Sequence, residues 1–273
     1  MEIIGERIRS FMREVVERRL WRLEKRHEKE QFVKRKRSED YGTLEEVFDK
    51  PTLMTIYKML NTGALLGLYG ILNTGKEARV YLGELPDGSE VAVKIYLTTS
   101  SEFKKGMLMY IEGDPRFTRV RKDTRSLVYT WAMKEYRNLL AAFYAGVRVP
   151  KPMKVEKNVL LMEFIGKDGS PAPLLRETHA EDMHQIYRTL MKYVRAMYRK
   201  AQLVHGDLSE YNVMIYKGKP VVFDLSQAVL TAHPRAKEYL QRDLSNLERY
   251  FGNFGVEVKP LDKAYEWVTG GKE

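Results

Sequence analysis

The chain contains no cysteine among its 273 residues, which excludes disulfide bonds and thiolate metal sites. No apolar run is long enough to span a bilayer, and no cationic segment followed by an apolar one stands after Met1. We therefore expect neither a membrane helix nor a signal peptide. These absences predict a cytoplasmic protein without membrane attachment.

Positive charge and moderate hydrophobicity are what the composition does contain. Lys and Arg number 47 against 37 Asp and Glu, a net charge of +10, and 44% of residues are hydrophobic. A chain of 273 residues is long enough to bury a sizeable hydrophobic core, and we expect it to fold into two lobes. The charge favours a polyanionic partner, although a basic cluster can also be a solvated helix face. Two clusters stand out, the run 34–37 (KRKR) and a group formed by Arg116, Arg119, Arg121, Lys122 and Arg125.

The most informative stretch covers residues 203–227 and reads LVHGDLSEYNVMIYKGKPVVFDLSQ. Two short apolar runs flank the turn 216–219, which predicts a hairpin. Asn212 would precede its first strand and Asp224 would end its second, so an amide and a carboxylate can meet on one metal ion. Asp207 lies beside them, where it can accept a proton from a hydroxyl or water. Kinases use these three parts for phosphoryl transfer with Mg²⁺.

A lysine strand stands upstream at residues 90–97 (EVAVKIYL). Strand alternation places Ala92 and Lys94 on one face, where a small side chain leaves room for a flat base and the ammonium points toward phosphates. A lysine buried on a sheet face needs an anionic partner. Glu135, within a helical pattern, is the natural candidate.

The loop that precedes this strand, residues 73–78 (NTGKEA), has neither the G-x-G-x-x-G pattern of protein kinases nor the spacing of a Walker A loop. Gly75 alone offers unrestricted backbone there. Phosphate contacts must therefore come partly from side chains. We expect Asn73, Thr74 and Lys76 to be the donors.

Taken in order, these motifs resemble the RIO family of atypical serine/threonine kinases, and its type 1 subfamily in particular. The resemblance covers about residues 65–255. One departure is Asn73, where the family usually has serine. The motifs that carry the resemblance are TGKEA (74–78), AVK (92–94), MEFIGKD (162–168), PAPLL (171–175), LVHGDLSEYN (203–212) and DLSQ (224–227).

The resemblance implies an α+β, two-lobed protein-kinase-like fold. Its parts would be an N-terminal helical extension (1–64), a small and mostly β N-lobe (65–165) and a reduced, α-rich C-lobe (166–273). It also implies that ATP and Mg²⁺ are bound. The resemblance also implies a role in ribosome assembly, because type 1 enzymes associate with a maturing small ribosomal subunit and its rRNA.

Site roles follow from the resemblance as well. Asn212 and Asp224 would hold Mg²⁺, and Asp207 would be catalytic. Asp224 would also accept the phosphoryl group transiently as an aspartyl phosphate, which makes the enzyme an ATPase as well as a kinase. The backbone of Glu163 and Ile165 would bind adenine. Met162 would set the depth of that pocket.

Three classes of function remain open. The leading one is a RIO-type kinase or ATPase, and only 49 residues (273 − 224) follow Asp224, without the A-P-E motif from which protein kinases build a peptide groove. Small-molecule kinases of the aminoglycoside or choline type also carry H-G-D-L-x-x-x-N. A catalytically silent RNA-binding scaffold is the third. TGKEA and DLSQ speak against the second, and the retained polar residues speak against the third.

Periodicity predicts the remaining organisation. Residues 98–124 are expected to form a long loop, which in RIO kinases is flexible and can be autophosphorylated. Helices are expected at 2–36, 43–62, 125–145, 181–201, 234–251 and 260–269. Strands are expected near 68–73, 78–85, 90–97, 152–156 and 158–164.

Overall fold

The computed structural model describes residues 47–98, 101–117, 121, 123–178 and 182–270. Residues Asp49–Glu273 form one compact unit, separate from Met1–Phe48. The predicted first helix (2–36) and the basic run 34–37 lie outside the described residues. None of the helices in the described part of the chain has the length and apolar character of a membrane span.

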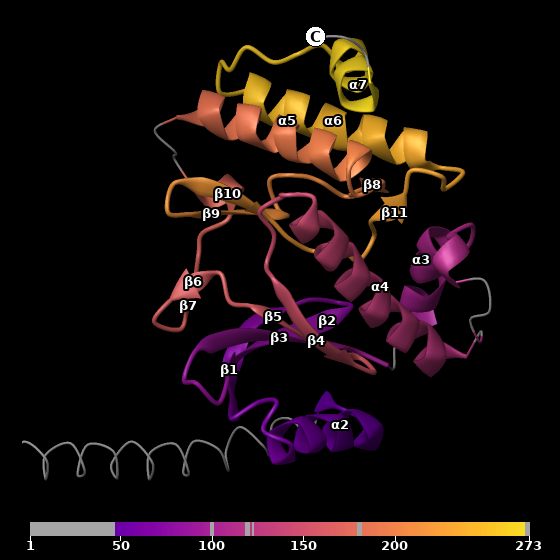
Figure 1. The fold of residues 1–273 in the computed structure, drawn as a ribbon, viewed down its shortest axis with the longest axis vertical. Coiled ribbons are helices and arrows are strands. Elements are labelled where there is room, and N and C mark those ends of the chain that lie inside the picture. The colour runs from indigo at the N-terminus through magenta and orange to yellow at the C-terminus, as the bar shows by residue number, and fades with distance from the viewer. Residues whose placement is uncertain (1–46, 99–100, 118–120, 122, 179–181, 271–273) are drawn as a thin grey trace, which may run out of the picture. The chain divides into compact units, whose positions relative to one another are not determined.

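One lobe is built on an antiparallel sheet of five strands in the order β1-β2-β3-β5-β4 (Figure 1). Short turns connect β1 to β2, β2 to β3 and β4 to β5, and Gly88, with φ of 82°, allows the tight turn between β2 and β3. The central strand β3 is buried from Val91 to Tyr96. The strands are β1 (Gly67–Thr74), β2 (Ala78–Glu84), β3 (Glu90–Tyr96), β4 (Pro152–Glu156) and β5 (Val159–Glu163).

Two helices accompany the sheet. α2 (Lys50–Asn61) begins after Asp49, whose carboxylate accepts a hydrogen bond from the Thr52 N–H, and it buries Ile56 and Met59. Its start is later than the predicted 43–62. α4 (Thr124–Tyr144), capped by Asp123, packs against β4 and β5 and buries residues along its whole length.

The second lobe is mostly helical. α5 (Met183–Arg199), α6 (Ala236–Gly252) and α7 (Leu261–Thr269) pack on one another (Figure 1). Between them and the sheet lie the short pair β8 (Leu203–Val204) and β11 (Val229–Leu230) and two hairpins, β6 (Gly166–Lys167) with β7 (Ser170–Pro171) and β9 (Val213–Tyr216) with β10 (Lys219–Val222). The α+β class, the hairpin and the helices of this lobe agree with the prediction.

The segment 98–124 was predicted as a loop, and this was wrong. It contains α3 (Ser101–Ile111) and the short 3₁₀ helix η1 (Pro115–Phe117). Met107, Tyr110 and Ile111 are buried, and the Tyr110 ring stacks on Tyr239 with centroids 5.2 Å apart. Helical spacing of these apolar residues outweighs the interruptions at Gly106 and Gly113 that suggested a loop.

Candidate active site

A cleft of about 410 Å³ brings together the sheet, the connection after β5 and the loops around β9 and β10. Ligand pockets for nucleotide-sized molecules fall in this range of volume. Of the predicted site residues, Asn73, Met162, Glu163, Ile165, Asn212 and Asp224 line it. The apolar part of the wall comes from residues including Leu72, Val80, Ala92, Met162, Ile165, Met214 and Phe223.

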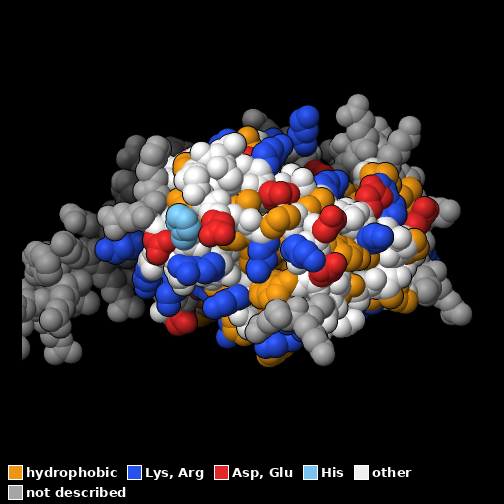
Figure 2. Space-filling model, turned by 90° about the horizontal axis from the view of Figure 1, so that it is seen from above, with side chains coloured by type: hydrophobic (Ala, Val, Ile, Leu, Met, Phe, Trp, Pro, Cys, Tyr) orange, Lys and Arg blue, Asp and Glu red, His pale blue; other side chains and the backbone are white. Residues whose placement is uncertain are grey.

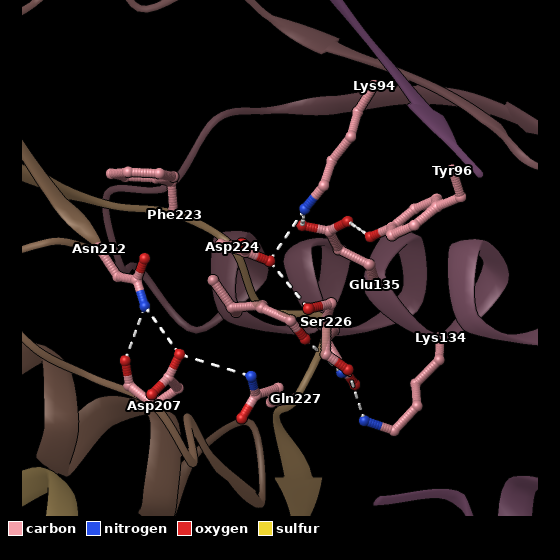
Figure 3. A network of polar contacts seen from close by, with 12 residues as sticks. Lys94, Tyr96, Lys134, Glu135, Asp207, Asn212, Phe223, Asp224, Ser226 and Gln227 are labelled. Carbon is pink, nitrogen blue, oxygen red and sulfur yellow. Dashed lines mark hydrogen bonds and ion pairs between the residues drawn. The ribbon is translucent and has the colours of Figure 1, made fainter. Parts of the chain in front are cut away.

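Lys94 is held by two carboxylates, of which Asp224 lines the cleft (Figure 3). The cleft lining does not include Lys94, Glu135 or Asp207 themselves. Its Nζ lies 2.9 Å from Oε1 of Glu135 and 2.9 Å from Oδ1 of Asp224. The predicted contact with Glu135 is therefore present. Burial lowers the pKa of Lys94, but the charges of Asp224 and Glu135 raise it more, so the net pKa lies above its ordinary value. The side chain is an ammonium at neutral pH.

Glu135 has a second partner that the sequence did not indicate. The hydroxyl of Tyr96, two residues after Lys94 on β3, donates to Oε2 of this carboxylate. Both Glu135 and Tyr96 are buried. Burial raises the pKa of Glu135, and Lys94 counteracts that rise. A lysine and a tyrosine at i and i+2 of a strand share one face, and this spacing was the available signal.

Asp224 occupies an uncommon backbone conformation, with φ of 57°. Its Oδ1 accepts hydrogen bonds from Lys94 and, at 2.8 Å, from the hydroxyl of Ser226. Oδ2 has no partner among the described residues, and 40% of the side chain is exposed to the cleft. Burial raises the pKa of Asp224, but Lys94 and Ser226 lower it more, so the net pKa lies below its ordinary value. A carboxylate with one free oxygen therefore faces the cleft.

Asp207 and Asn212 contact each other directly (Figure 3). Nδ2 of Asn212 donates to the backbone carbonyl of Asp207 at 2.8 Å and to its Oδ2 at 3.2 Å. The amide nitrogen is thereby used, which leaves its oxygen as the group for a cation. Burial and then the charge of Asp224 raise the pKa of Asp207. A half-buried carboxylate with a raised pKa is suited to accept a proton.

The loop that carries Asp207 is held by a carboxylate from α6. Asp243 accepts hydrogen bonds from the backbone N–H groups of Gly206 and Leu208, both at 2.8 Å. Burial raises the pKa of Asp243 to about 7. Sequence reasoning missed this residue. The signal was an acid on the apolar face of a helix, at helical spacing from Leu240 and Leu247.

The loop 73–78 was predicted to contact phosphate, and that contact stays a prediction. β1 extends through Thr74, and Asn73 lines the cleft, whereas Thr74 and Lys76 are exposed and lie outside its lining. Glu77 in the same turn is a carboxylate that the sequence analysis did not single out. Burial and then the charge of Asp224 raise its pKa to about 7.

The connection after β5 presents backbone to the cleft. The N–H of Glu163 donates to the Lys151 carbonyl at 2.9 Å, and the carbonyl of Ile165 accepts from the Ala172 N–H at 2.9 Å. These bonds use the two groups that the adenine prediction does not need. The Glu163 carboxylate is held by Arg148 in a two-pronged pair at 2.7 and 2.6 Å.

The donor chemistry of the site fits Mg²⁺ and a nucleotide phosphate. Asn212 and Asp224 offer oxygen atoms, which are the ligands that Mg²⁺ prefers. The described residues contain no group of three or more His, Cys, Asp or Glu that would form an all-protein metal cage. That agrees with Mg²⁺, which usually takes one or two protein ligands and completes its shell with phosphates and water.

Two described members of the second basic cluster, Arg116 and Arg125, have partners within the fold. Nη2 of Arg116 lies 2.7 Å from Oδ2 of Asp114, and Nη1 donates to Oδ1 of Asn138 at 2.9 Å. Arg125 pairs with Asp49 at 3.1 Å. These internal partners account for both arginines within the fold, and the contact with RNA phosphates stays a prediction.

Comparisons with known proteins agree with this geometry. A model of the RIO domain matches residues 79–264. The RIO-type serine/threonine-protein kinase Rio1 of Haloferax volcanii is 42% identical over 86% of this chain and 80% of its own length. The corresponding protein of Methanocaldococcus jannaschii is 36% identical over 93% and 87%. Human serine/threonine-protein kinase RIO1 is 38% identical over 90% of this chain, which spans 44% of that longer protein.

Among solved structures, the chain resembles Rio2 kinase from Chaetomium thermophilum, crystallised as an ADP/Mg²⁺–phosphoaspartate complex. The TM-score is 0.60 at 20% identity, covering 80% of this chain and 66% of that one. At this identity the likeness establishes the fold alone, which is the two-lobed kinase-like fold expected from the motifs. Family match and relatives together show that the chain belongs to the RIO family of atypical protein kinases, of the Rio1 type.

Proposed function

We propose that this protein is an ATP- and Mg²⁺-dependent serine/threonine kinase and ATPase of the cytoplasm that acts in maturation of the small ribosomal subunit. The observation that carries the catalytic part is the position of Lys94 between buried Glu135 and Asp224, whose side chain lines the cleft. The Lys94 ammonium therefore links strand β3 to the Asp224 carboxylate, which faces the cleft. A phosphate group entering the cleft would meet both the cation and the metal-binding oxygens.

The nucleotide would lie along the cleft with its base against the connection after β5. The Glu163 carbonyl and the Ile165 N–H would pair with adenine, and Met162 would limit its depth. Asn73, Thr74 and Lys76 would contact the phosphates at the outer end, and Lys94 at the inner end. Asn212 and Asp224 would hold Mg²⁺, which when bound neutralises charge on the phosphates.

Asp224 would also be the first phosphoryl acceptor. A carboxylate oxygen of Asp224 attacks the γ-phosphorus, the bond from that phosphorus to the β–γ bridging oxygen breaks, and ADP leaves with the electron pair. Water then attacks the phosphorus of the acyl phosphate while Asp207 takes its proton. The P–O bond to the carboxylate breaks, which regenerates Asp224 and releases inorganic phosphate.

One observation on the structure supports this route. The free Oδ2 of Asp224 faces the cleft. The Rio2 structure with the same fold contains a phosphoaspartate, and it contributes an analogy of fold. We further propose that the cycle times release from the ribosomal subunit, so that ATP hydrolysis exceeds transfer to added proteins.

The catalytic proposal is tested by ATP turnover at saturating Mg²⁺. Asp207→Asn and Asn212→Ala should each reduce kcat by about 10²–10⁴-fold while the protein stays folded. Asp168→Asn is the matched control, since Asp168 is exposed on the β6–β7 turn, has φ of 52° and lies outside the cleft lining. Wild-type turnover by either site variant would contradict the assignment.

The intermediate is tested by labelling with γ-³²P-ATP followed by an acid quench. Hydroxylamine and alkali cleave an acyl phosphate, whereas phosphoserine resists hydroxylamine. We expect label that hydroxylamine removes and that Asp224→Asn lacks. Label that survives hydroxylamine and persists in Asp224→Asn would leave Asp224 as a metal ligand only.

An RNA partner is supported by α5. Between Asp182 and Asp207 the chain has no acidic residue. The outward face of α5 carries Arg188, Lys192 and Arg199 at helical spacing, all exposed. None of these three has an ion-pair partner among the described residues. Figure 2 looks onto the end of the molecule formed by α5, α6 and α7, where Lys and Arg side chains gather among a smaller share of acidic ones.

Salt dependence tests this partner. Binding to small ribosomal subunits or their rRNA should weaken steeply with salt. Replacing Arg188, Lys192 and Arg199 together by Gln should reduce the slope of log K against log salt by about two units, at about 0.7–0.9 per phosphate contact. The same change at three exposed lysines of β-turns, Lys157, Lys167 and Lys219, should leave the slope unchanged. An equal slope in both triple variants would remove α5 from the interface.

The basic run 34–37 is a second candidate contact that lies outside the described residues. We propose that neutralising its four side chains lowers the same slope. Binding that does not depend on salt at all would mean that the positive charge serves solubility alone.

A further inference from the structure

The backbone turn 225–228 that follows Asp224 is held by side chains of α4, which comes from the other lobe. Nζ of Lys134 donates to the carbonyl of Ser226 at 2.8 Å and to that of Ala228 at 2.5 Å (Figure 3). Lys134 is completely buried. No carboxylate contacts its ammonium among the described residues, so its hydrogen bonds go to this turn.

Asn138, one helical turn further along α4, holds the same turn. Its Nδ2 donates to the carbonyls of Leu225 at 2.8 Å and Ala228 at 2.9 Å. Its Oδ1 accepts from Nη1 of Arg116 in η1 at 2.9 Å. That contact fixes which end of the amide faces the turn. Arg116 is itself fixed by Asp114, which is buried.

Burying Lys134 and Asn138 completely is costly for folding unless their donors are used, and apolar side chains would fill the same space more cheaply. Their donors converge on three of the four carbonyls of one turn. The residue that this turn follows, Asp224, has φ of 57°, a conformation that costs free energy in a residue with a Cβ and persists only where its surroundings impose it.

We propose that Lys134 and Asn138 are positioning residues that hold Asp224 in its left-handed conformation, and that Arg116 acts on Asp224 through the Asn138 amide. α4 then carries both the carboxylate that fixes Lys94, which is Glu135, and the donors that fix the turn after Asp224. The catalytic part of this inference rests on the proposed phosphoryl transfer. The coupling of η1 to the turn stands on the hydrogen bonds alone.

The first test is Arg116→Gln, with Lys237→Gln on the exposed face of α6 as the control. Because Arg116→Gln also removes the cation that pairs with the buried carboxylate of Asp114, the free energy of unfolding should fall, and the rates are compared at a temperature at which both proteins are folded. We expect kcat for ATP to fall about tenfold in Arg116→Gln, the equivalent of one hydrogen bond, with KM for ATP within about twofold of wild type. A purely structural defect would alter kcat and KM together.

Hydrogen exchange in nucleotide-free protein provides a readout that does not need activity. The amides of 225–230 should exchange several-fold faster in Arg116→Gln than in wild type or Lys237→Gln. This measurement distinguishes the proposed ATPase function from the proposed coupling of η1 to the turn 225–228. If the wild-type enzyme proved inactive but exchange were still faster in Arg116→Gln, the ATPase proposal would fail and the coupling would stand.

A double-mutant cycle with Asn138→Ala tests the route. If Arg116 acts through Asn138, adding Arg116→Gln to Asn138→Ala should change kcat by less than about twofold. Should Asn138→Ala fail to fold, Lys134→Met in place of it removes the other pair of donors, and there the two effects should multiply. Wild-type kcat and wild-type exchange in Arg116→Gln would overturn the proposal, and so would full additivity with Asn138→Ala.

Discussion

The two sides of the cleft are held in different ways. On the sheet side, Lys94 and Glu135 form an ion pair in which both members are buried, and the Tyr96 hydroxyl completes it. On the loop side, Asp207 and Asp224 are half-buried. Their neighbouring backbone groups, rather than their own side chains, are held by hydrogen bonds from Asp243 and Lys134. The sheet side is suited to fix phosphate by charge. Among the described residues, the loop side leaves Oδ2 of Asp224 free, as the proposed metal binding and phosphoryl transfer require.

Breaking the sheet side should have the largest effect. Lys94→Met leaves Glu135 buried without a cation, so the free energy of unfolding should fall by about 3–5 kcal/mol. ATP turnover should fall at least about 10³-fold, because the phosphate and Asp224 both lose their cation. Denaturant unfolding and ATPase assays measure the two losses. Double replacement with Glu135→Gln should recover part of the stability and none of the activity, and full recovery of turnover would refute the role of Lys94.

Loosening the loop side should have a smaller effect on activity. In Asp243→Asn, one amide oxygen replaces a carboxylate that accepts from both Gly206 and Leu208. We expect ATP turnover to fall about 10–100-fold. Nucleotide binding in the absence of Mg²⁺, measured by calorimetry, should change by less than about twofold. Loss of nucleotide binding would mean that both sides of the cleft depend on this carboxylate.

The same residue makes stability depend on pH. The pKa of Asp243 is raised to about 7 in the folded protein, so the folded state binds its proton more tightly than the unfolded chain does. This contribution to stability is fully present below the ordinary pKa and is lost as pH rises through about 7. Relative to Asp243→Asn, the wild type should lose stability in urea between pH 5 and pH 8. A constant difference would contradict the raised pKa.

How far the sequence predicted the site depends on which atoms make each contact. The motifs predicted the contact between Lys94 and Glu135 and the hairpin around Asn212, because side-chain chemistry and strand period carry that information. Asp243, Lys134 and Asn138 act on backbone groups, which every residue has, across 35 to 94 positions of chain. No local pattern marks such partners. α3 was missed for another reason, since two glycines obscured the helical spacing of its buried residues.

Tyr96→Phe tests how much the tyrosine hydroxyl contributes to the ion pair on the sheet side. Removing the hydroxyl leaves Oε2 of Glu135 without its donor, while Lys94 keeps Oε1. Turnover should fall about 3–10-fold, and the free energy of unfolding by about 1–2 kcal/mol. Tyr129→Phe on α4, where the ring is only half-buried, is the control. An unchanged rate would mean that Lys94 alone orients Glu135.

The smallest effect should come from the adenine end. Arg148 forms the two-pronged pair with the Glu163 carboxylate and stiffens the backbone expected to bind the base. In Arg148→Gln we expect KM for ATP to rise about threefold with kcat unchanged, because the contact is equal in the ground and transition states. Steady-state kinetics at saturating Mg²⁺ distinguish this from a fall in kcat, which would place Arg148 among the residues that affect chemistry.

The claim that the loop side performs the chemistry is tested most directly on Asp224 itself. Borohydride reduces an aspartyl phosphate to homoserine, whereas free aspartate does not react. Enzyme quenched during turnover, reduced and digested, should contain homoserine at position 224 by mass spectrometry, and only when ATP and Mg²⁺ were both present. Unmodified Asp224 under these conditions, together with phosphate on a serine or threonine, would contradict the account.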